Sequence, residues 1–415
     1  MSVGVDVPDD VTAWLAGRAV PLAGLAPGSG LTDLAPLRAA LQDARLVGLG
    51  EATHGSAEFF LLRWRLTELC IKELGFTTLA IEASAAAARA VDAYTAGGPG
   101  DPRDALAGLR FWTLHTAEML TVLERLRDHN CTAARPVRFV GIDPQHPQPA
   151  LEALRACLGE PATPLLDPLG DLGRHGFTQP LDRQAEADAR RLEEHVAAYG
   201  PDEAREHARI VRQFADVASR PRVHTDPERT LAAARDRYLA ENVARLVTGP
   251  EDKVVVWAHN SHVARSARGV RPMGAHLAGE FGEAYYAIAV LFGHGEFRAH
   301  RRRFGRLVRK PPALFRVPPS LPRVRPSRFR VPPAGAPGDV AARLAAAHPG
   351  DYVVDLRGGD HPEDVATWLA ATNQVRGFGG MARRVRSRSA FRDTILADEF
   401  DGLAFLRQVS ASTPL

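Results

Sequence analysis

The sequence predicts an α/β fold, with a mostly parallel central sheet flanked by helices and one inserted helical subdomain. Two observations predict it. Short apolar runs of four to eight residues recur without polar alternation, and segments with helical periodicity separate them. Such runs are typical of strands that are covered on both faces, as in a parallel sheet under helices.

Seven apolar runs are the expected strands of this sheet. Helices are expected between them, for example over Ser56–Leu74 and Ala83–Tyr94. In chain order the expected strands are Leu46–Leu49, Thr78–Ile81, Val137–Ile142, Val254–Ala258, Tyr285–Phe292, Tyr352–Leu356 and Leu403–Leu406.

The pattern changes between residues 163 and 249, where the apolar residues follow helical spacing over three consecutive segments. Gly200 ends the first predicted helix, Pro201 opens the second, and Asp226-Pro227-Glu228 opens the third. We interpret 163–249 as a helical insertion that leaves the sheet and returns to it. Residues 1–162 and 250–415 then form the α/β core.

The formal net charge of the 415 residues is only +3, but the charge is unevenly distributed. Residues 297–338 carry twelve basic side chains, nine prolines and no acidic side chain, which predicts a basic, proline-rich loop within the core. Such a loop could contact nucleic acid or another polyanion. An exposed arginine-rich loop is the simpler interpretation, because no stacking platform or recognition helix accompanies it, and a nucleic-acid partner is not expected.

Composition excludes several classes of protein. No apolar run approaches the roughly 20 residues of a transmembrane helix, and the segment that follows Met1 lacks the pattern of a signal peptide. The three cysteines, Cys70, Cys131 and Cys157, are too widely spaced for a disulfide scaffold or a zinc ribbon. We therefore expect a soluble, cytoplasmic protein without membrane contact.

Titratable side chains follow several of the expected strands. Because the carboxyl ends of parallel strands meet at one edge of a sheet, these side chains are expected to lie together. They are Glu51, His54, Glu82, Asp143, His259 and His262.

His54 lies in a tight turn between a strand and a helix. The positive potential at the helix N-terminus opposes protonation of its ring, so a neutral imidazole that can accept a proton is expected. Glu51, three residues earlier, is positioned to orient the ring as a carboxylate does in a catalytic dyad. The alternative role of His54 is to cap the helix.

His259 and His262 converge if a helical turn begins after their strand. With Glu51, His54 and Glu82 they resemble a site for a divalent metal ion, but they would serve equally as donors to a carbonyl oxygen or an oxyanion. The sequence contains no Gly-x-Ser-x-Gly elbow, and no cysteine stands where a helix N-terminus would activate it. Direct attack by water is therefore favoured over a covalent mechanism, and no cofactor is expected to be required.

Arg235, Tyr238 and Asn242 lie on one face of the third predicted helix. This face is either solvated or a polar stripe that looks into a cleft. In the second interpretation these three side chains, together with Asp143, bind substrate.

The ordered set of motifs resembles the erythromycin esterase family, over about residues 35–410 of this chain. The basic stretch in 297–338 has no counterpart in the family pattern. The motifs that carry the resemblance are Gly50–Gly55, Glu58-Phe59, Arg63, Ala80–Ala83, Gly141–Pro144, Arg235–Tyr238, Glu241-Asn242, Trp257–Val263, Met273–Leu277 and Asp355–Arg357.

The resemblance implies a water-dependent hydrolase of a small-molecule ester or lactone, and members studied for drug resistance open the macrolactone ester of macrolide antibiotics. It implies that His54 is the general base and that Glu51 and Arg63 fix its geometry. It also implies that His259 and His262 polarise the ester carbonyl, and that Glu82 orients water or a histidine. In the family the helical insertion roofs the cleft, so substrate selection is expected there.

Two other functions stay open at this point. The same base could serve a biosynthetic step on a polyketide or saccharide, such as cyclisation, dehydration or deacylation. Alternatively, the segment Arg298–Arg330 could bind a polyanion, in which case binding would weaken steeply with salt.

Overall fold

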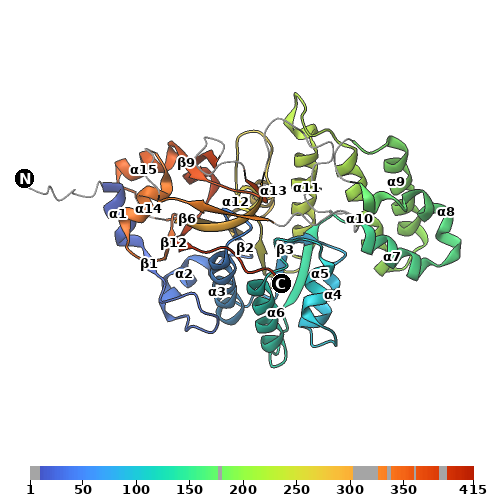
Figure 1. The fold of residues 1–415 in the computed structure, drawn as a ribbon, viewed down its shortest axis with the longest axis horizontal. Coiled ribbons are helices and arrows are strands. Elements are labelled where there is room, and N and C mark those ends of the chain that lie inside the picture. The colour runs from blue at the N-terminus through green and yellow to red at the C-terminus, as the bar shows by residue number, and fades with distance from the viewer. Residues whose placement is uncertain (1–9, 176–179, 302–325, 334–337, 359–360, 383–389) are drawn as a thin grey trace, which may run out of the picture.

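The computed structural model describes the chain except for residues 1–9, 176–179, 302–325, 334–337, 359–360 and 383–389. Within the described residues, a ten-stranded sheet with helices on both faces forms the centre of the molecule (Figure 1). Its order is β1 (Val20–Pro21), β8 (Tyr352–Asp355), β12 (Gly402–Val409), β6 (Tyr285–Arg301), β2 (Leu46–Leu49), β5 (Val254–Trp257), β3 (Thr78–Ser84) and β4 (Arg138–Asp143).

The six strands from β12 to β4 run parallel to one another. At one edge β8 pairs antiparallel with β12, and β1 pairs antiparallel with β8. Two further strands, β7 (Ser327–Val331) and β10 (Met381–Ala382), pair with the distal part of β6. A separate two-stranded sheet consists of β9 (Thr372–Arg376) and β11 (Phe391–Ile395). The predicted fold class is confirmed, and a strand lies at each of the seven expected positions.

The prediction of a loop over 297–338 is wrong near both ends of this range, where strands β6 and β7 lie. Strand β6 continues to Arg301, well past the expected Phe292, and β7 pairs with it from Gly295↔Val331 to Ala299↔Ser327. Phe297 also stacks on Phe329 and Phe378, so apolar side chains hold these two strands within the basic stretch. Residues 302–325 and 334–337 of the stretch lie outside the described residues.

Alternate residues of each central strand face opposite helical layers, which explains why the runs are continuously apolar. Val47 and Val255 pack into one core cluster, and Val254 and Val256 into the other. The first cluster lies under α2 (Ala35–Leu41), α3 (Ala57–Leu74), α4 (Ala88–Thr95), α5 (Pro102–Gly108) and α6 (Ala117–Asn130). The second lies under α1 (Asp10–Arg18), α11 (Leu231–Ala244), α12 (Asn260–Val263), α13 (Met273–Phe281), α14 (Val340–Ala347), α15 (Glu363–Ala370) and α16 (Leu396–Glu399).

A helical unit with its own core lies at one end of the molecule (Figure 1). It consists of α7 (Gln148–Leu158), α8 (Thr163–Leu166), α9 (Arg183–Tyr199) and α10 (Asp202–Ser219). It differs from the expected insertion 163–249 at both ends. Helix α7 precedes residue 163 and packs on α10, whereas α11, which begins at Leu231 rather than at Asp226, packs on β4 and α13. Helix α11 therefore belongs to the α/β core and carries Arg235 into it.

Residues 410–415 form an extended strap across the first turns of α3 and α6. The backbone N–H of Ala57 donates to the Ser410 carbonyl at 2.9 Å, and that of Ala117 donates to the Thr413 carbonyl at 2.8 Å. Each helix also contributes a glutamate, because Glu58 accepts from the Ser410 N–H and Glu118 from that of Thr413. The strap therefore joins two segments that are far apart in sequence.

Gly55 is required by a close approach of backbones beside this strap. Its carbonyl accepts from the N–H groups of Arg298 at 3.0 Å and Ser412 at 2.9 Å. A Cβ built on Gly55 would lie 2.0 Å from the Arg298 carbonyl oxygen, a contact that only backbone movement can relieve.

We expect Gly55→Ala to lower the free energy of unfolding by about 1–3 kcal/mol, because the added methyl overpacks the junction of the turn with β6. Chemical denaturation followed by circular dichroism measures this. Gly17→Ala is the matched control, since Gly17 is exposed and its Cβ would meet nothing within 4 Å. An equally stable Gly55→Ala protein would contradict the close approach.

Candidate active site

Glu51 is a buried carboxylate in the turn after β2, and it pairs with two side chains. Its Oε1 lies 2.7 Å from His54 Nδ1 and its Oε2 lies 2.8 Å from an Arg63 guanidinium nitrogen. Because an ionised carboxylate only accepts hydrogen bonds, Nδ1 of His54 carries the proton. The neutral ring then presents Nε2 as its proton acceptor.

Arg63 enters this turn from α3 and is held from two sides. Its guanidinium stacks over Trp257 at 4.7 Å and over Phe60 at 5.2 Å, and its Nε donates to the Phe59 carbonyl. The side chain is almost completely buried. A fixed cation therefore holds Glu51 in place under His54.

The pKa of His54 is shifted opposite to the direction expected from the sequence. Burial lowers it, but the charge of Glu51 and the hydrogen bond to it, with the charge of Glu82, outweigh burial and raise the pKa overall. The expected lowering of the His54 pKa is therefore wrong, because the Glu51 carboxylate, 2.7 Å from Nδ1, favours the protonated ring.

A second buried network centres on Arg235. Its guanidinium donates to Asp143 at 2.5 Å and to Glu82 at 2.7 Å, and it contacts His262 Nε2 at 3.1 Å. Glu82 lies at a register shift in β3, and Asp143 is the last residue of β4. Burial raises the pKa of Glu82, but His262, Arg235 and His54 lower it well below its usual range, so Glu82 is ionised.

His262 is fixed by Asp236 as well as by this network. Its Nδ1 lies 2.7 Å from Asp236 Oδ1, which also accepts from the Met273 N–H at 2.8 Å. Burial lowers the pKa of His262, but Asp236 and Glu82 raise it overall. Both ring nitrogens are thus occupied by protein groups, so His262 is a supporting member of the network.

His259 differs from His262, because one of its nitrogens has no partner. It caps α12: its Nδ1 accepts from the Ser261 N–H and lies 2.8 Å from Ser261 Oγ, while its own backbone N–H donates to Glu82. Its buried Nε2 has no hydrogen-bond partner. Burial, with the nearby His54 and His262, lowers its pKa well below the usual value, so the ring is neutral with the proton on Nε2.

The rings of His54 and His259 lie 5.2 Å apart at their centroids. The Glu51 and Glu82 carboxylates, each paired with a guanidinium group, lie next to these rings. Among the described residues, no three His, Cys, Asp or Glu side chains gather as ligands for a metal ion. The arrangement suits a proton transfer at His54 Nε2 next to a hydrogen-bond donor at His259 Nε2.

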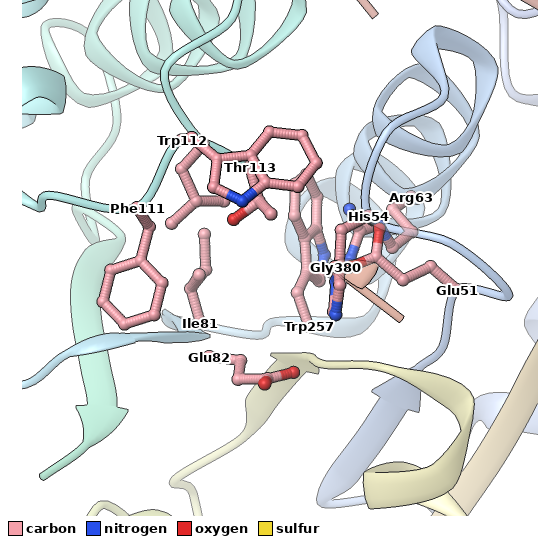
Figure 2. A pocket seen from close by; sticks show the side chains of 11 residues that line it. Glu51, His54, Arg63, Ile81, Glu82, Phe111, Trp112, Thr113, Trp257 and Gly380 are labelled. Atoms are coloured by element: carbon pink, nitrogen blue, oxygen red, sulfur yellow. Dashed lines mark hydrogen bonds and ion pairs between the residues drawn. The ribbon is translucent and has the colours of Figure 1, made fainter. Parts of the chain in front are cut away.

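A pocket opens beside His54, with about 530 Å³ of empty space, part of which is open to solvent (Figure 2). Glu51, His54 and Arg63 lie on one side of it, and Phe111 and Ile81 lie on the other. The complete lining is Glu51, His54, Arg63, Ile81, Glu82, Phe111, Trp112, Thr113, Leu114, Trp257 and Gly380. Among the described residues, none of 163–249 lines this pocket, so the expected roof is instead formed by the turn 111–114 and Gly380.

Comparison with known proteins shows the family to which this chain belongs. The family model described as erythromycin esterase matches residues 71–409, which is most of the chain. The chain belongs to the erythromycin esterase family. As a member of this family it is an ester-bond hydrolase.

The esterase is similar to characterised and solved relatives over long stretches. It is 25% identical to the erythromycin esterase type II of Escherichia coli over 319 residues, which cover 67% of this chain and 76% of that protein. A solved succinoglycan biosynthesis protein is 21% identical, with 99% of each chain covered and a TM-score of 0.78. A mutant of the erythromycin esterase EreC in its open conformation is 19% identical, with 96% and 98% covered and a TM-score of 0.68. These two structures share the fold of this chain.

The structure places two of the predicted substrate-binding residues of the esterase elsewhere. The Tyr238 hydroxyl donates to Asp216 at 2.8 Å, and Asn242 donates to the Ile142 carbonyl at 2.8 Å. Both side chains are buried, so the interpretation of a solvated face is wrong for them. They join α11 to α10 and β4, whereas Arg235 and Asp143 lie in the network beside the pocket.

Sequence reasoning missed Asp236 and the pocket wall 111–114. Asp236 directly follows Arg235 in a family motif, but only the fold shows that it meets His262. Phe111 and Trp112 are adjacent aromatic residues in a short segment between two helices, and this pattern could have indicated a pocket wall.

Among the helices that the structure describes, none has the length and apolar character needed to span a membrane.

We expect Arg235→Met to cost about 3–5 kcal/mol of stability and to reduce activity, because it leaves Asp143 and Glu82 buried without their cation. Thermal and urea unfolding with parallel activity assays measure both effects. The control is Arg205→Met, whose ion pair with Asp202 is exposed and worth at most about 1 kcal/mol. If both variants had wild-type stability, the Arg235 network would not support the site.

Proposed function

We propose that this esterase hydrolyses a small-molecule ester or lactone by direct attack of water, with His54 as the general base. The observation that carries the proposal is the Glu51–His54 pair beside the pocket, which leaves Nε2 of His54 as the proton acceptor. We further propose that the reaction takes place in the cytoplasm, and that it requires no metal ion or organic cofactor.

In the proposed reaction each polar group has a separate task. His54 Nε2 removes a proton from water as the oxygen attacks the carbonyl carbon, and the resulting imidazolium is stabilised by Glu51. Arg63 holds Glu51 against rotation. When the tetrahedral intermediate collapses, the imidazolium returns the proton to the leaving alcohol oxygen.

His259 is the proposed donor to the carbonyl oxygen. Its Nε2 is buried without a partner, and its ring is adjacent to that of His54. A donor without a protein partner stabilises an oxyanion without first giving up a hydrogen bond. Glu82 fixes the backbone of His259, and it connects His259 through Arg235 to His262.

A macrolide lactone is the first substrate to test. The family match and the Escherichia coli relative support it, and antibiotic resistance would be its biological consequence. The second candidate is a biosynthetic tailoring step, such as deacylation of a saccharide. The solved succinoglycan biosynthesis protein, which resembles this chain along its whole length, favours that candidate. Release of free acid from O-acylated oligosaccharides would distinguish it.

We expect the wild type to add one water to at least one member of a macrolide panel, seen by mass spectrometry, and His54→Ala to lose about 10²–10⁴-fold in rate. His195→Ala is the control, because His195 is an exposed histidine on α9. Equal turnover by the wild type and His54→Ala would overturn the mechanism. If the wild type opened no macrolide, the macrolide substrate would be wrong.

The raised pKa of His54 predicts a shifted pH profile. A general base must be neutral, so the acid limb of kcat/KM should lie above the ordinary histidine pKa of about 6.5. Glu51→Gln removes the charge that stabilises the imidazolium. The acid limb should therefore move to lower pH while the plateau rate falls.

Stopped-assay pH profiles of kcat/KM for both proteins measure the shift. Glu283→Gln serves as the control, because it removes an exposed carboxylate and should leave the limb in place. An acid limb that stayed in place, or moved to higher pH, in Glu51→Gln would show that Glu51 does not set the His54 pKa.

Metal independence is tested separately. We expect activity to survive dialysis against EDTA and 1,10-phenanthroline, and elemental analysis to show no stoichiometric transition metal. Loss of activity with chelator, and its return with one divalent ion, would overturn the proposal and identify that ion.

A further inference from the structure

We propose that the turn Phe111–Leu114, with Trp112 at its centre, is a subsite that binds an uncharged ring of the substrate. The proposal deepens the proposed ester hydrolysis, because it concerns the same pocket. It moves substrate selection away from the helical unit of α7 to α10 and onto this turn. Three observations support it. The pocket has a polar half and an apolar half, backbone contacts hold the turn in place, and a positive charge lies next to Trp112.

The pocket has a polar half and an apolar half. Figure 2 shows Trp112 and Thr113 across the pocket from Glu82, with Phe111 and Ile81 far from His54. Phe111 and Leu114 are buried, whereas Trp112 is partly exposed and so available to a ligand. A substrate whose carbonyl lies at His54 therefore directs its remaining atoms toward an aromatic surface.

The turn is fixed before any ligand arrives. Arg110, which leads into it, has a φ of 57°, a left-handed conformation that is unfavourable for a residue with a side chain. Thr116, which follows it, caps α6 and bridges to Pro414 of the strap. The same strap bonds to the Gly55 carbonyl, next to His54. The wall and the base are thus held at a set separation, which reduces the entropy cost of binding.

Trp112 is supported from behind by two basic residues of β6. The Arg298 guanidinium lies 5.6 Å from the indole ring, and the His300 ring meets it edge-on at 5.3 Å. Arg298 and His300 are two residues apart on one strand and so point to the same face. Burial, with the charge of Arg298, lowers the pKa of His300, so the positive charge behind Trp112 belongs to Arg298.

These charges determine which ring the subsite takes. Within the pocket lining, Glu51 is bound by Arg63, and Glu82 shares Arg235 with Asp143. Arg298 adds positive charge next to the indole, so an ammonium group bound there would be repelled by its guanidinium. A neutral alicyclic ring buries apolar area on Trp112 without that penalty.

Three 4-nitrophenyl esters test this: the cyclohexanecarboxylate and the N-methylpiperidinium-4-carboxylate, whose acyl rings are of similar size, and the acetate as the small ringless reference. For the wild type we expect kcat/KM for the cyclohexyl ester to exceed that for the piperidinium ester at least tenfold. Trp112→Ala should lose about tenfold on the cyclohexyl ester, mainly through KM, and little on the acetate. Trp112→Phe should retain most of the preference, and Trp14→Ala, which changes a tryptophan outside the pocket, should retain all of it.

Binding of the three corresponding amides, followed by saturation-transfer NMR, tests the subsite without turnover. If no ester is hydrolysed but the cyclohexyl amide binds to the wild type and not to Trp112→Ala, the subsite stands and the proposed hydrolysis fails. If Trp112→Ala binds that amide as the wild type does, or if the piperidinium amide binds as well as the cyclohexyl amide, the subsite is overturned. Circular dichroism confirms the fold of each variant.

Discussion

The requirement that buried carboxylates be paired with buried cations organises this enzyme. Glu51, Glu82 and Asp143 lie at the carboxyl edge of the sheet, where water is largely excluded. An ionised carboxylate in such a place is stable only when fixed donors replace its hydration shell. Two guanidinium groups supply those donors, and the positions of the histidines follow from them.

The two cations reach the site from different layers of the fold. Arg63 comes from α3, on one face of the sheet, and Arg235 comes from α11, on the other. Each uses a planar fork to hold carboxylates rigidly, which a lysine ammonium could not do. His54 is thereby tied to the first layer and His262 to the second, while His259 lies between them with one nitrogen unused. The reactive groups are therefore positioned by the packing of two helices, α3 and α11, on opposite faces of the sheet.

The sequence predicted what depends on short-range pattern. The strands were visible as continuous apolar runs, and the site residues at the strand ends followed from the geometry of parallel sheets. What it could not predict depends on long-range packing. Tyr238 and Asn242 share a helix with Arg235, but α10 covers them and leaves Arg235 to the sheet. The direction of the His54 pKa shift depends on a distance to Glu51 that no spacing rule gives. Likewise the pocket wall comes from the turn 111–114, whose place opposite His54 is set by the fold alone.

The strap 410–415 affects the stage of synthesis and folding at which the pocket of the enzyme is completed. Its hydrogen bonds to Glu58 span 352 residues of sequence and those to Glu118 span 295. Contacts of such separation cost much chain entropy to close, which makes their formation slow. During synthesis the turn that carries His54 leaves the ribosome long before its partner in the strap does. A nascent chain is thus without a finished pocket until residues 410–415 have been made, which delays hydrolytic chemistry until the segments between His54 and the strap exist.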